Sequence, residues 1–498
     1  MKKIYKSIAL TVTILGLVSC GNDWLDTKPA DGIPTSEAIT NYNDALTART
    51  GMYDGLQGNS TYTSYYAARM FYYGDVRGED MQARTQGMRS SSCYEMRYTV
   101  DDAPNMWNVP YNVLRRANRL IQAIDNKKVT DAKEEQIGKI YSEALVVRAL
   151  VHFDLVRIYS MPYTADNGAS LGIPIILEPL EKEALPSRNT VAEVYTQVIK
   201  DLNSAINSTF LATGKTQGYI NLWSAKALLA RVYLTKGDNV NALATAEDII
   251  KNSPYKLWTT EEYVDAWQKE NGSHTNEMIF EVLNNSNDDW TDREGIAYLL
   301  NEDGYADAIV TKSFTEMLSK DPKDIRLDVI LPALSDAGLI KQYGKAKIFI
   351  NKFPADPKSG EMRLNSLPLL RLSEVYLNAA EAAVKLGNSQ DKAALYLNAI
   401  VQRANPDAVA IEAANVTLER ILIERRKELI GEGQRFFDAM RNNETITRYT
   451  DSKDQGYHYS LNVESRKFDR KYFRAILPIP VTETNVNANL KAQQNPGY

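Results

Sequence analysis

Histidine is scarce in this sequence, and the familiar catalytic motifs are missing from it. The 498 residues include only His152, His274 and His458, and no H-x-x-x-H or H-E-x-x-H spacing places two metal ligands on one helical face. No G-x-S-x-G elbow, Walker loop or dinucleotide fingerprint occurs either. His152 falls on an apolar helical stripe beside Phe153, a position typical of a core histidine. We therefore expect a protein that is not an enzyme.

An excess of positive charge is also missing. The chain has 58 Lys and Arg against 63 Asp and Glu, which gives a formal net charge of -5. Phosphate binding needs clustered Lys and Arg. The basic runs RRANR and ERRKE fall on predicted helices among glutamates and apolar residues, so solvated faces or internal ion pairs explain them better. The composition argues against a nucleic acid partner.

The N-terminus has no apolar run long enough to span a membrane. Lys2, Lys3 and Lys6 precede an apolar stretch from Ile8 to Val18, whereas a membrane-spanning helix needs roughly 20 apolar residues. This pattern is typical of a secretory signal peptide. The residues Leu17 to Cys20 then have the form of a bacterial lipobox, whose cysteine receives lipid and becomes the new N-terminus. The alternative is an ordinary signal peptide cut near an unimportant cysteine.

Cysteine is almost absent from the rest of the chain. Cys93 is the only other cysteine, so acylation of Cys20 leaves a single thiol and no intramolecular disulfide. An exported protein without disulfides must be stabilised by a packed core, and 498 residues that are 44% hydrophobic suffice for one. We expect a signal peptide over residues 1–19, lipidation at Cys20, and attachment to the membrane through that lipid.

Helical periodicity dominates the mature sequence. Apolar residues recur every three or four positions from Tyr111 to Asp125, and similar stripes follow along the chain. The predicted helices cover residues 111–125, 133–159, 191–207, 222–235, 240–252, 370–386, 392–404 and 418–441. We expect a mainly α fold with long irregular loops and minor β structure.

Two of the predicted helix pairs resemble tetratricopeptide repeats. Around the first pair, small residues and a turn glycine, Gly237, come before Pro254, which ends the second helix. The second pair has the same plan with Gly387 and Pro406, one residue out of register. Burying a continuous core takes about three such repeats. The helices predicted at 111–159 and 191–207 can supply the remainder.

Two long segments between the helices have a different character. Residues 59–100 are rich in Tyr, Arg, Gly and Ser, and residues 258–308 hold aromatic side chains among Asn, Asp and Glu. Long loops inside a compact chain are commonly functional, and this aromatic content argues against disorder. An aromatic ring there either anchors its own loop or offers a platform on which a sugar or peptide stacks. The candidate ligand-binding residues are Trp290, Trp267, Tyr298, Tyr72, Arg69 and Asp289.

The acidic stretch Asn285 to Glu294 is a candidate Ca²⁺-binding loop. Its oxygens could ligate Ca²⁺, but it lacks the turn glycine and terminal glutamate of an EF-hand. We interpret this segment as a solvated loop, and a structural Ca²⁺ site is the weaker alternative. We expect no other cofactor.

Several segments, in order along nearly the whole mature chain, together resemble the SusD/RagB surface lipoproteins of Bacteroidetes. The resemblance rests on DWLDTKP after Cys20, RALVHFDLVRIYSMPY, LGIPII, NLWSAKALLARVYLTKGD, EMIFEV, DIR, LLRLSEVYLNAAEA, ERRKELIGEGQRFFDAMR and the closing LPIPVTETNVNANLKAQQNPGY. It implies one α-rich unit, with an N-terminal region over residues 20–230 and a C-terminal region over residues 231–498 packed together. It also implies a non-enzymatic binder at the outer membrane, facing the cell exterior, that serves a SusC-like TonB-dependent transporter.

The charged residues of these motifs lie at helical spacings that suit buried or half-buried ion pairs. They are Arg148, Asp154, Arg157, Glu424, Arg425, Glu428, Arg435 and Asp438. We therefore interpret the motifs as scaffold and place the ligand on the variable loops. Within the resemblance the ligand is most often a glycan, and a peptide is the alternative. A helical-repeat adaptor without a small ligand, or a surface hydrolase, are the competing functions.

Overall fold

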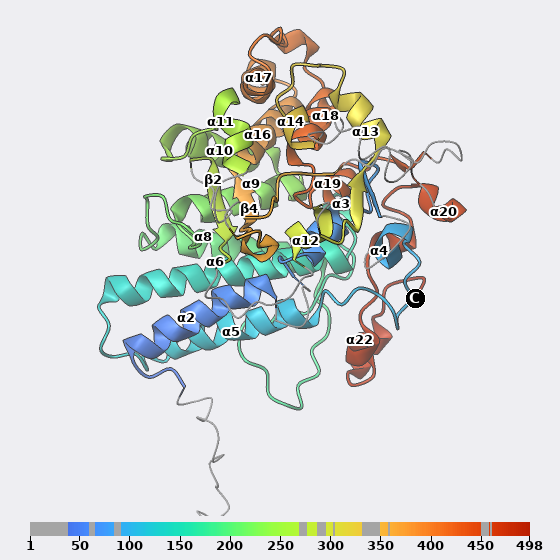
Figure 1. Ribbon diagram of the computed structural model, residues 1–498. Helices are drawn as coiled ribbons and strands as arrows, with labels where there is room; N and C mark the ends of the chain where they lie inside the picture. The colour runs from blue at the N-terminus through green and yellow to red at the C-terminus, as the bar shows by residue number, and fades with distance from the viewer. Residues whose placement is uncertain are drawn as a thin grey trace, which may run out of the picture.

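The computed structural model describes residues 38–58, 65–83, 91–267, 276–285, 295–301, 304–330, 349–356, 359–449, 458 and 461–498. Helices dominate these residues and the strands are short, which confirms the predicted fold class (Figure 1).

The longer helices form a row in which each helix packs on the next (Figure 1). The row consists of α2 (Tyr42–Gln57), α5 (Asn108–Asp125), α6 (Glu134–Tyr159), α8 (Val191–Asn207), α9 (Leu222–Lys236), α10 (Asn239–Asn252), α16 (Leu372–Leu386) and α17 (Gln390–Ala404). A further helix, α18 (Leu418–Leu429), packs on α16. An amphipathic helix pair cannot bury its apolar face alone, so stacking neighbouring pairs provides the continuous core.

Local sequence sets the ends of these helices. The side chain of Asn221 accepts a hydrogen bond from the backbone N–H of Ser224 and caps α9. The same helix ends at Gly237, whose φ of 87° is left-handed and favours glycine. Gly387 ends α16 in the same way, with φ of 75°. Both glycines therefore occupy the turns that the sequence predicts.

The predicted helix 370–386 is wrong at its start. Residues Leu367–Arg371 form β4, which pairs antiparallel with β2 (Met278–Val282), and the helix begins only at Leu372. The segment is apolar enough for either structure, and pairing with a distant strand decides between them.

The predicted helix 418–441 is interrupted. After α18 the chain turns through Gly431 and Gly433, whose φ angles are 79° and 74°, and resumes as α19 (Arg435–Arg441). The turn allows a close approach to α3 (Arg69–Asp75), because a Cβ atom on Gly74 would lie 1.8 Å from the carbonyl oxygen of Gly433. Only glycine at position 74 fits this crossing.

The remaining elements are short. The strands β1 (Met81–Ala83) and β3 (Ala308–Val310) pair antiparallel, as do β5 (Ile446–Thr447) and β6 (Lys467–Phe468). The other helices are α4 (Ser91–Glu95), α7 (Tyr163–Asp166), α11 (Thr260–Trp267), α12 (Ile296–Leu300), α13 (Lys312–Leu318), α14 (Leu327–Ile330), α20 (Val463–Arg466), α21 (Val481–Thr484) and α22 (Ala488–Ala492), with 3-10 turns η4 (Met362–Leu364), η5 (Ala413–Asn415) and η6 (Phe473–Ala475).

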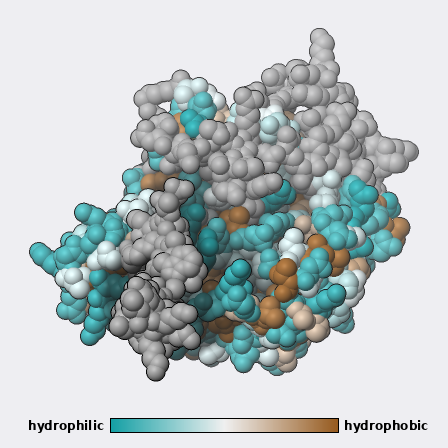
Figure 2. All heavy atoms as spheres, turned by 90° about the horizontal axis from the view of Figure 1, so that it is seen from below, coloured by the Kyte–Doolittle hydropathy of each residue, from teal (hydrophilic) through white to brown (hydrophobic). Residues whose placement is uncertain are grey.

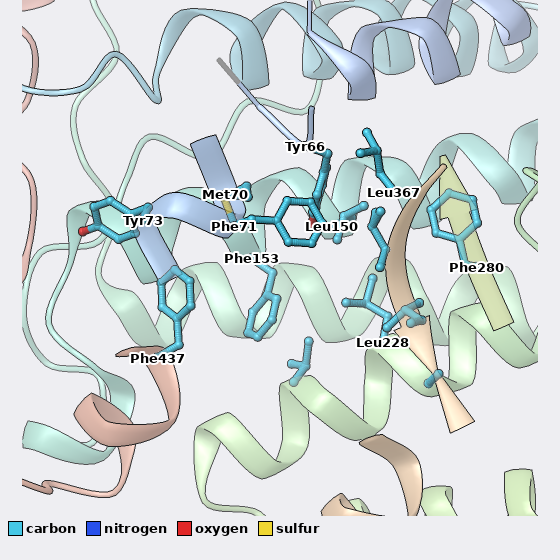
Figure 3. Packing of buried hydrophobic residues seen from close by; sticks show 14 of the residues in the cluster. Tyr66, Met70, Phe71, Tyr73, Leu150, Phe153, Leu228, Phe280, Leu367 and Phe437 are labelled. Atoms are coloured by element: carbon cyan, nitrogen blue, oxygen red, sulfur yellow. The ribbon is translucent and has the colours of Figure 1, made fainter. Parts of the chain in front are cut away.

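The main hydrophobic core runs through both predicted regions of the chain, from Ala45 to Leu490. Figure 3 shows part of it, where Met70 and Phe71 of α3 lie near Leu150 and Phe153 of α6. The predicted division of the chain at residue 230 falls inside α9, and this division stays a prediction.

Buried ion pairs join the helices, and the charged motif residues are their members. Arg148 donates to Asp201 of α8 at 2.7 Å instead of pairing within α6. Arg157 pairs with Asp154 one turn away on α6. Arg425 pairs with Asp438 at 3.0 Å across the α18–α19 turn. The expectation of buried ion pairs is confirmed, and several of the partners come from distant segments.

Glu428 lies at the centre of the largest of these clusters. Its carboxylate accepts hydrogen bonds from Arg403 at 2.6 Å, Arg371 at 2.8 Å and Arg326 at 3.2 Å. Although burial acts in the opposite direction, the three guanidinium groups hold the pKa of Glu428 well below its ordinary value. The cluster also includes Glu277, Glu432, Glu424, Asp324 and Lys352.

Candidate functional site

The two aromatic segments singled out in the sequence meet in the structure. The backbone N–H of Ile296 donates to the carbonyl of Ala67 at 2.7 Å, so α12 is tied to the chain just before α3. The β1–β3 pair adds a second connection between the same two segments. Figure 1 shows α3 and α12 side by side, away from the ends of the helical row.

Two tyrosines at this junction form the best candidate platform among the described residues. The rings of Tyr298 and Tyr305 lie 5.7 Å apart, and both are partly exposed. The backbone N–H of Tyr305 donates to the carbonyl of Tyr298 at 2.7 Å. Gly304 permits this tight return, because a Cβ there would lie 2.3 Å from the same oxygen. Backbone bonding therefore holds the two residues that carry these rings next to each other.

Buried amide side chains lie on several of the elements around this region. The side-chain amide of Gln57 donates to the side-chain oxygen of Asn284 at 2.6 Å, and Asn284 donates to the carbonyl of Asn365 at 2.6 Å. In β1, the amide of Gln82 is fully buried and its nitrogen and oxygen have no hydrogen-bond partner within the described part of the chain. Sequence reasoning missed these amides because no local pattern distinguishes them from loop residues.

Two of the predicted ligand contacts are corrected. Trp267 is 0% exposed and packs between Trp258 and Phe353, with ring centroids 5.4 and 6.2 Å away. Tyr72 is 5% exposed, and its hydroxyl donates to the carbonyl of Leu299 at 3.4 Å. Neither ring presents a face to a ligand. Both act as anchors, and Tyr72 holds α3 against the helix that bears Tyr298.

The other described tyrosines between residues 65 and 73 are also buried. The hydroxyls of Tyr65 and Tyr66 donate to Asp154 at 2.9 and 2.5 Å. Tyr73 packs on Phe437 with ring centroids 5.7 Å apart (Figure 3). Arg69, the first residue of α3, is half-buried and stays a candidate. The anchoring role therefore applies to the four described tyrosines of this stretch.

Three predicted residues lie outside the described residues. These are Trp290 and Asp289 in the segment 286–294, and Cys20 at the predicted lipobox. Their predicted roles stay predictions, as does the Ca²⁺ alternative for the same acidic segment.

The two described histidines are core residues. Burial, with a contribution from Arg148, lowers the pKa of His152 to about 3. Burial, with a contribution from Arg448, lowers the pKa of His458 to about 3, and its ring contacts the Tyr94 hydroxyl at 3.1 Å. Neither is placed to transfer a proton near pH 7. Across the described ranges, no group of three His, Cys, Asp or Glu side chains is arranged to hold a metal ion.

Comparison with known families decides the identity of the fold. A model described as the SusD family matches residues 186–498. The chain belongs to the SusD family. A second model, described as starch-binding associating with outer membrane, matches residues 23–234 of this SusD-family chain. None of the described helices is long and apolar enough to cross a membrane.

Several relatives resemble this SusD-family chain over nearly its whole length. A SusD superfamily protein of Bacteroides thetaiotaomicron is 37% identical, with a TM-score of 0.83 over 92% of this chain and 100% of that one. A laminarin binding SusD-like protein has a TM-score of 0.69 and 24% identity over 92% of this chain and 100% of that one, which supports the fold alone. A SusD-like protein of Formosa agariphila is 25% identical over 100% of both chains.

Proposed function

We propose that the protein is a cell-surface lipoprotein that binds an oligosaccharide and delivers it, chemically unaltered, to a SusC-like TonB-dependent transporter. In this proposal a lipid on Cys20 anchors the protein to the outer membrane. Family membership supports it, as do the family model described as starch-binding and a Bacteroides thetaiotaomicron relative named as a starch-binding protein. No cofactor takes part.

The observation that carries the proposal is the Tyr298–Tyr305 pair. Apolar faces of sugar rings stack on aromatic rings while nearby amides and charges bond the hydroxyls. The pair is partly exposed, and hydrogen bonds to α12 hold it in place before a ligand arrives. A platform that is already ordered loses little conformational entropy on binding. Trp290 and Asp289, only a few residues before α12 in the sequence, are proposed to extend it.

The alternatives differ in what the same surface would bind. The buried histidines and paired carboxylates support a binder over a hydrolase, because a catalytic acid or base must reach its substrate. A peptide ligand would use the same tyrosines. An adaptor would contact its protein partner without any small ligand.

The test is calorimetric binding of laminarin and starch oligosaccharides to the purified lipoprotein. We expect Tyr298→Ala to weaken binding by about tenfold, which corresponds to about 1.4 kcal/mol for one lost stacking contact. Tyr219→Ala is the matched control, because Tyr219 is 40% exposed and lies on the loop before α9. Thermal unfolding of both variants checks that the fold is intact.

Three results would contradict this proposal. Binding of peptides but of no glycan would favour the peptide alternative. Co-purification of a transporter without any small ligand would favour an adaptor. Turnover of a polysaccharide by the pure protein would favour a hydrolase. The anchor has its own test, in which Cys20→Ala abolishes labelling by radioactive palmitate.

A further inference from the structure

A long groove follows one face of α5. The segment 174–186, here called the arch, lies over this helix and appears as the long connection below α5 in Figure 1. A hollow of about 480 Å³ lies between the arch, the first half of α5 and the C-terminal helices α21 and α22. A second hollow of about 380 Å³ lies at the other end of α5. Leu180 lines both hollows, so they adjoin at this side chain, and the two together are here called the α5 groove.

The floor of the α5 groove is a single helical stripe. Its residues Asn108, Asn112, Arg115, Arg119 and Ala123 are spaced three or four apart and line one hollow or the other. From Asn108 to Ala123 the axis of α5 rises about 22 Å at 1.5 Å per residue. An extended chain of about seven residues covers that length.

Apolar side chains line the walls of this groove and remain open to solvent. Leu180 and Leu185 of the arch are 51% and 50% exposed, and Val486 between α21 and α22 is 72% exposed. Figure 2 looks onto this side from below and shows apolar residues gathered on it. Clustered exposed apolar side chains in a soluble body commonly mark a contact surface.

The groove also carries more positive than negative side chains. Arg115, Arg119, Lys128 and Lys182 line it, against Glu181 and Glu483. The Nε atom of Arg119 is buried and makes no hydrogen bond within the described part of the chain. Burial and the nearby Arg115 both lower the pKa of Arg119, so an anionic group beside it is favourable.

The chain itself supplies a segment of matching chemistry. Ala38 and Ile39, where the described residues begin, line the second hollow. Residues 21–37, here called the leader, lie directly before them and carry four acidic side chains against one lysine. The leader also holds Trp24, Leu25 and Ile33. Trp24 is fourteen residues before Ala38, twice the length that the groove requires.

We propose that the leader docks in the α5 groove, with its apolar side chains against Leu180 and Leu185 and its carboxylates facing Arg115 and Arg119. The lipid on Cys20 then attaches next to a bound segment instead of a free tether. The body is held with its α5 side toward the membrane. This contact does not depend on the ligand of the Tyr298 region.

A membrane surface is a poorer occupant of the same face. Glu178 and Glu183 are exposed on the arch and line neither hollow, so an approaching anionic lipid surface meets them first. A segment inside the groove meets the arginines of α5 instead. The distribution of charge therefore favours the leader.

The test is hydrogen exchange by mass spectrometry on the purified lipoprotein in detergent. We expect amides of residues 22–34 to exchange at least tenfold more slowly than in a synthetic peptide of residues 21–37. Arg119→Glu and Leu180→Asp should each abolish this protection. Lys251→Glu on α10 and Val409→Asp are the matched controls, because Lys251 is exposed and Val409 is 89% exposed. Equal melting temperatures show that the variants fold.

Leader amides that exchange as fast as the peptide overturn the proposal, and so does protection that survives both groove variants. Protection that rises with protein concentration, together with a dimer by light scattering, assigns the groove to a second copy. Protection that requires added phosphatidylglycerol vesicles assigns it to the membrane. Both of these results also overturn docking of the leader.

Discussion

Replacing Glu428 by glutamine removes one charge from the centre of the buried cluster and keeps the shape of the side chain. Arg371, Arg403 and Arg326 then lose the carboxylate that they share at 2.6 to 3.2 Å. Glu428 is 0% exposed, so water cannot take its place. Breaking a buried pair in this way costs about 3–5 kcal/mol, because uncompensated charge remains in the interior.

The expected change in melting temperature follows from the size of the chain. An unfolding entropy of about 2.1 cal/mol/K per residue amounts to about 1 kcal/mol/K for a protein of this length. A loss of about 3–5 kcal/mol therefore lowers Tm by about 3–5 °C if the chain unfolds in one step. Differential scanning calorimetry at pH 7 measures this, with Glu419→Gln as the matched control because Glu419 is exposed on the same helix.

The pH dependence of this loss has a definite sign. The folded pKa of Glu428 lies below its ordinary value of 4.5, so its charge contributes full stability above about pH 4.5. As pH falls through the lowered folded value, that contribution disappears. The difference between the wild type and Glu428→Gln should therefore narrow only below pH 4.5. Equal effects of the two glutamine substitutions at pH 7 would refute this account of the cluster.

Gly74→Ala should prevent the approach of α3 to Gly433 and lower both the yield and Tm, whereas Gly214→Ala, which meets no atom within 4 Å, should change neither; similar melting curves for the two would contradict this. His458 has a folded pKa of about 3 against 6.5 when unfolded, so the unfolded state takes up the proton first and stability falls as pH drops below about 6.5. Urea unfolding at pH 7 and pH 5 should show a loss of stability between these two pH values that is smaller by about 2 kcal/mol in His458→Gln than in the wild type. An equal loss in the two proteins would count against a neutral buried ring.

The helices were predictable because their period is local. Val191–Asn207 has the predicted bounds, and α9 and α10 differ from theirs by one residue. The break between α18 and α19 could not be predicted, because the apolar period continues through it. The reason for the turn lies at Gly74, more than 350 residues earlier in the chain. Long-range packing of this kind leaves no trace in a short window of sequence.

The candidate site, too, could be predicted only in part from the sequence. The aromatic content of the loops indicated the two segments that meet at the junction, and the binding role of Tyr298 stays a prediction. The same loops also pointed to Trp267 and Tyr72, because an anchor and a platform have the same local sequence and differ only in what covers them. Tyr305 was visible as a loop aromatic, but its pairing with Tyr298 depends on the close turn at Gly304.

The ties between α3 and the α18–α19 turn have a consequence for how the protein is made. Arg426 donates to Asp80 at 2.9 Å, Arg435 donates to Glu79 at 2.6 Å, and the N–H of Gly433 donates to Asp75 at 2.7 Å. These partners are about 350 residues apart along the chain, so the contacts between the α3 region and the α18–α19 turn cannot form until nearly the whole polypeptide has been made. A product that stops before Arg426 retains the first helix pairs but leaves the acidic residues of the α3 region without their partners. Such a fragment leaves this surface open to proteases, and only the completed chain can assemble the junction that we propose as the binding face.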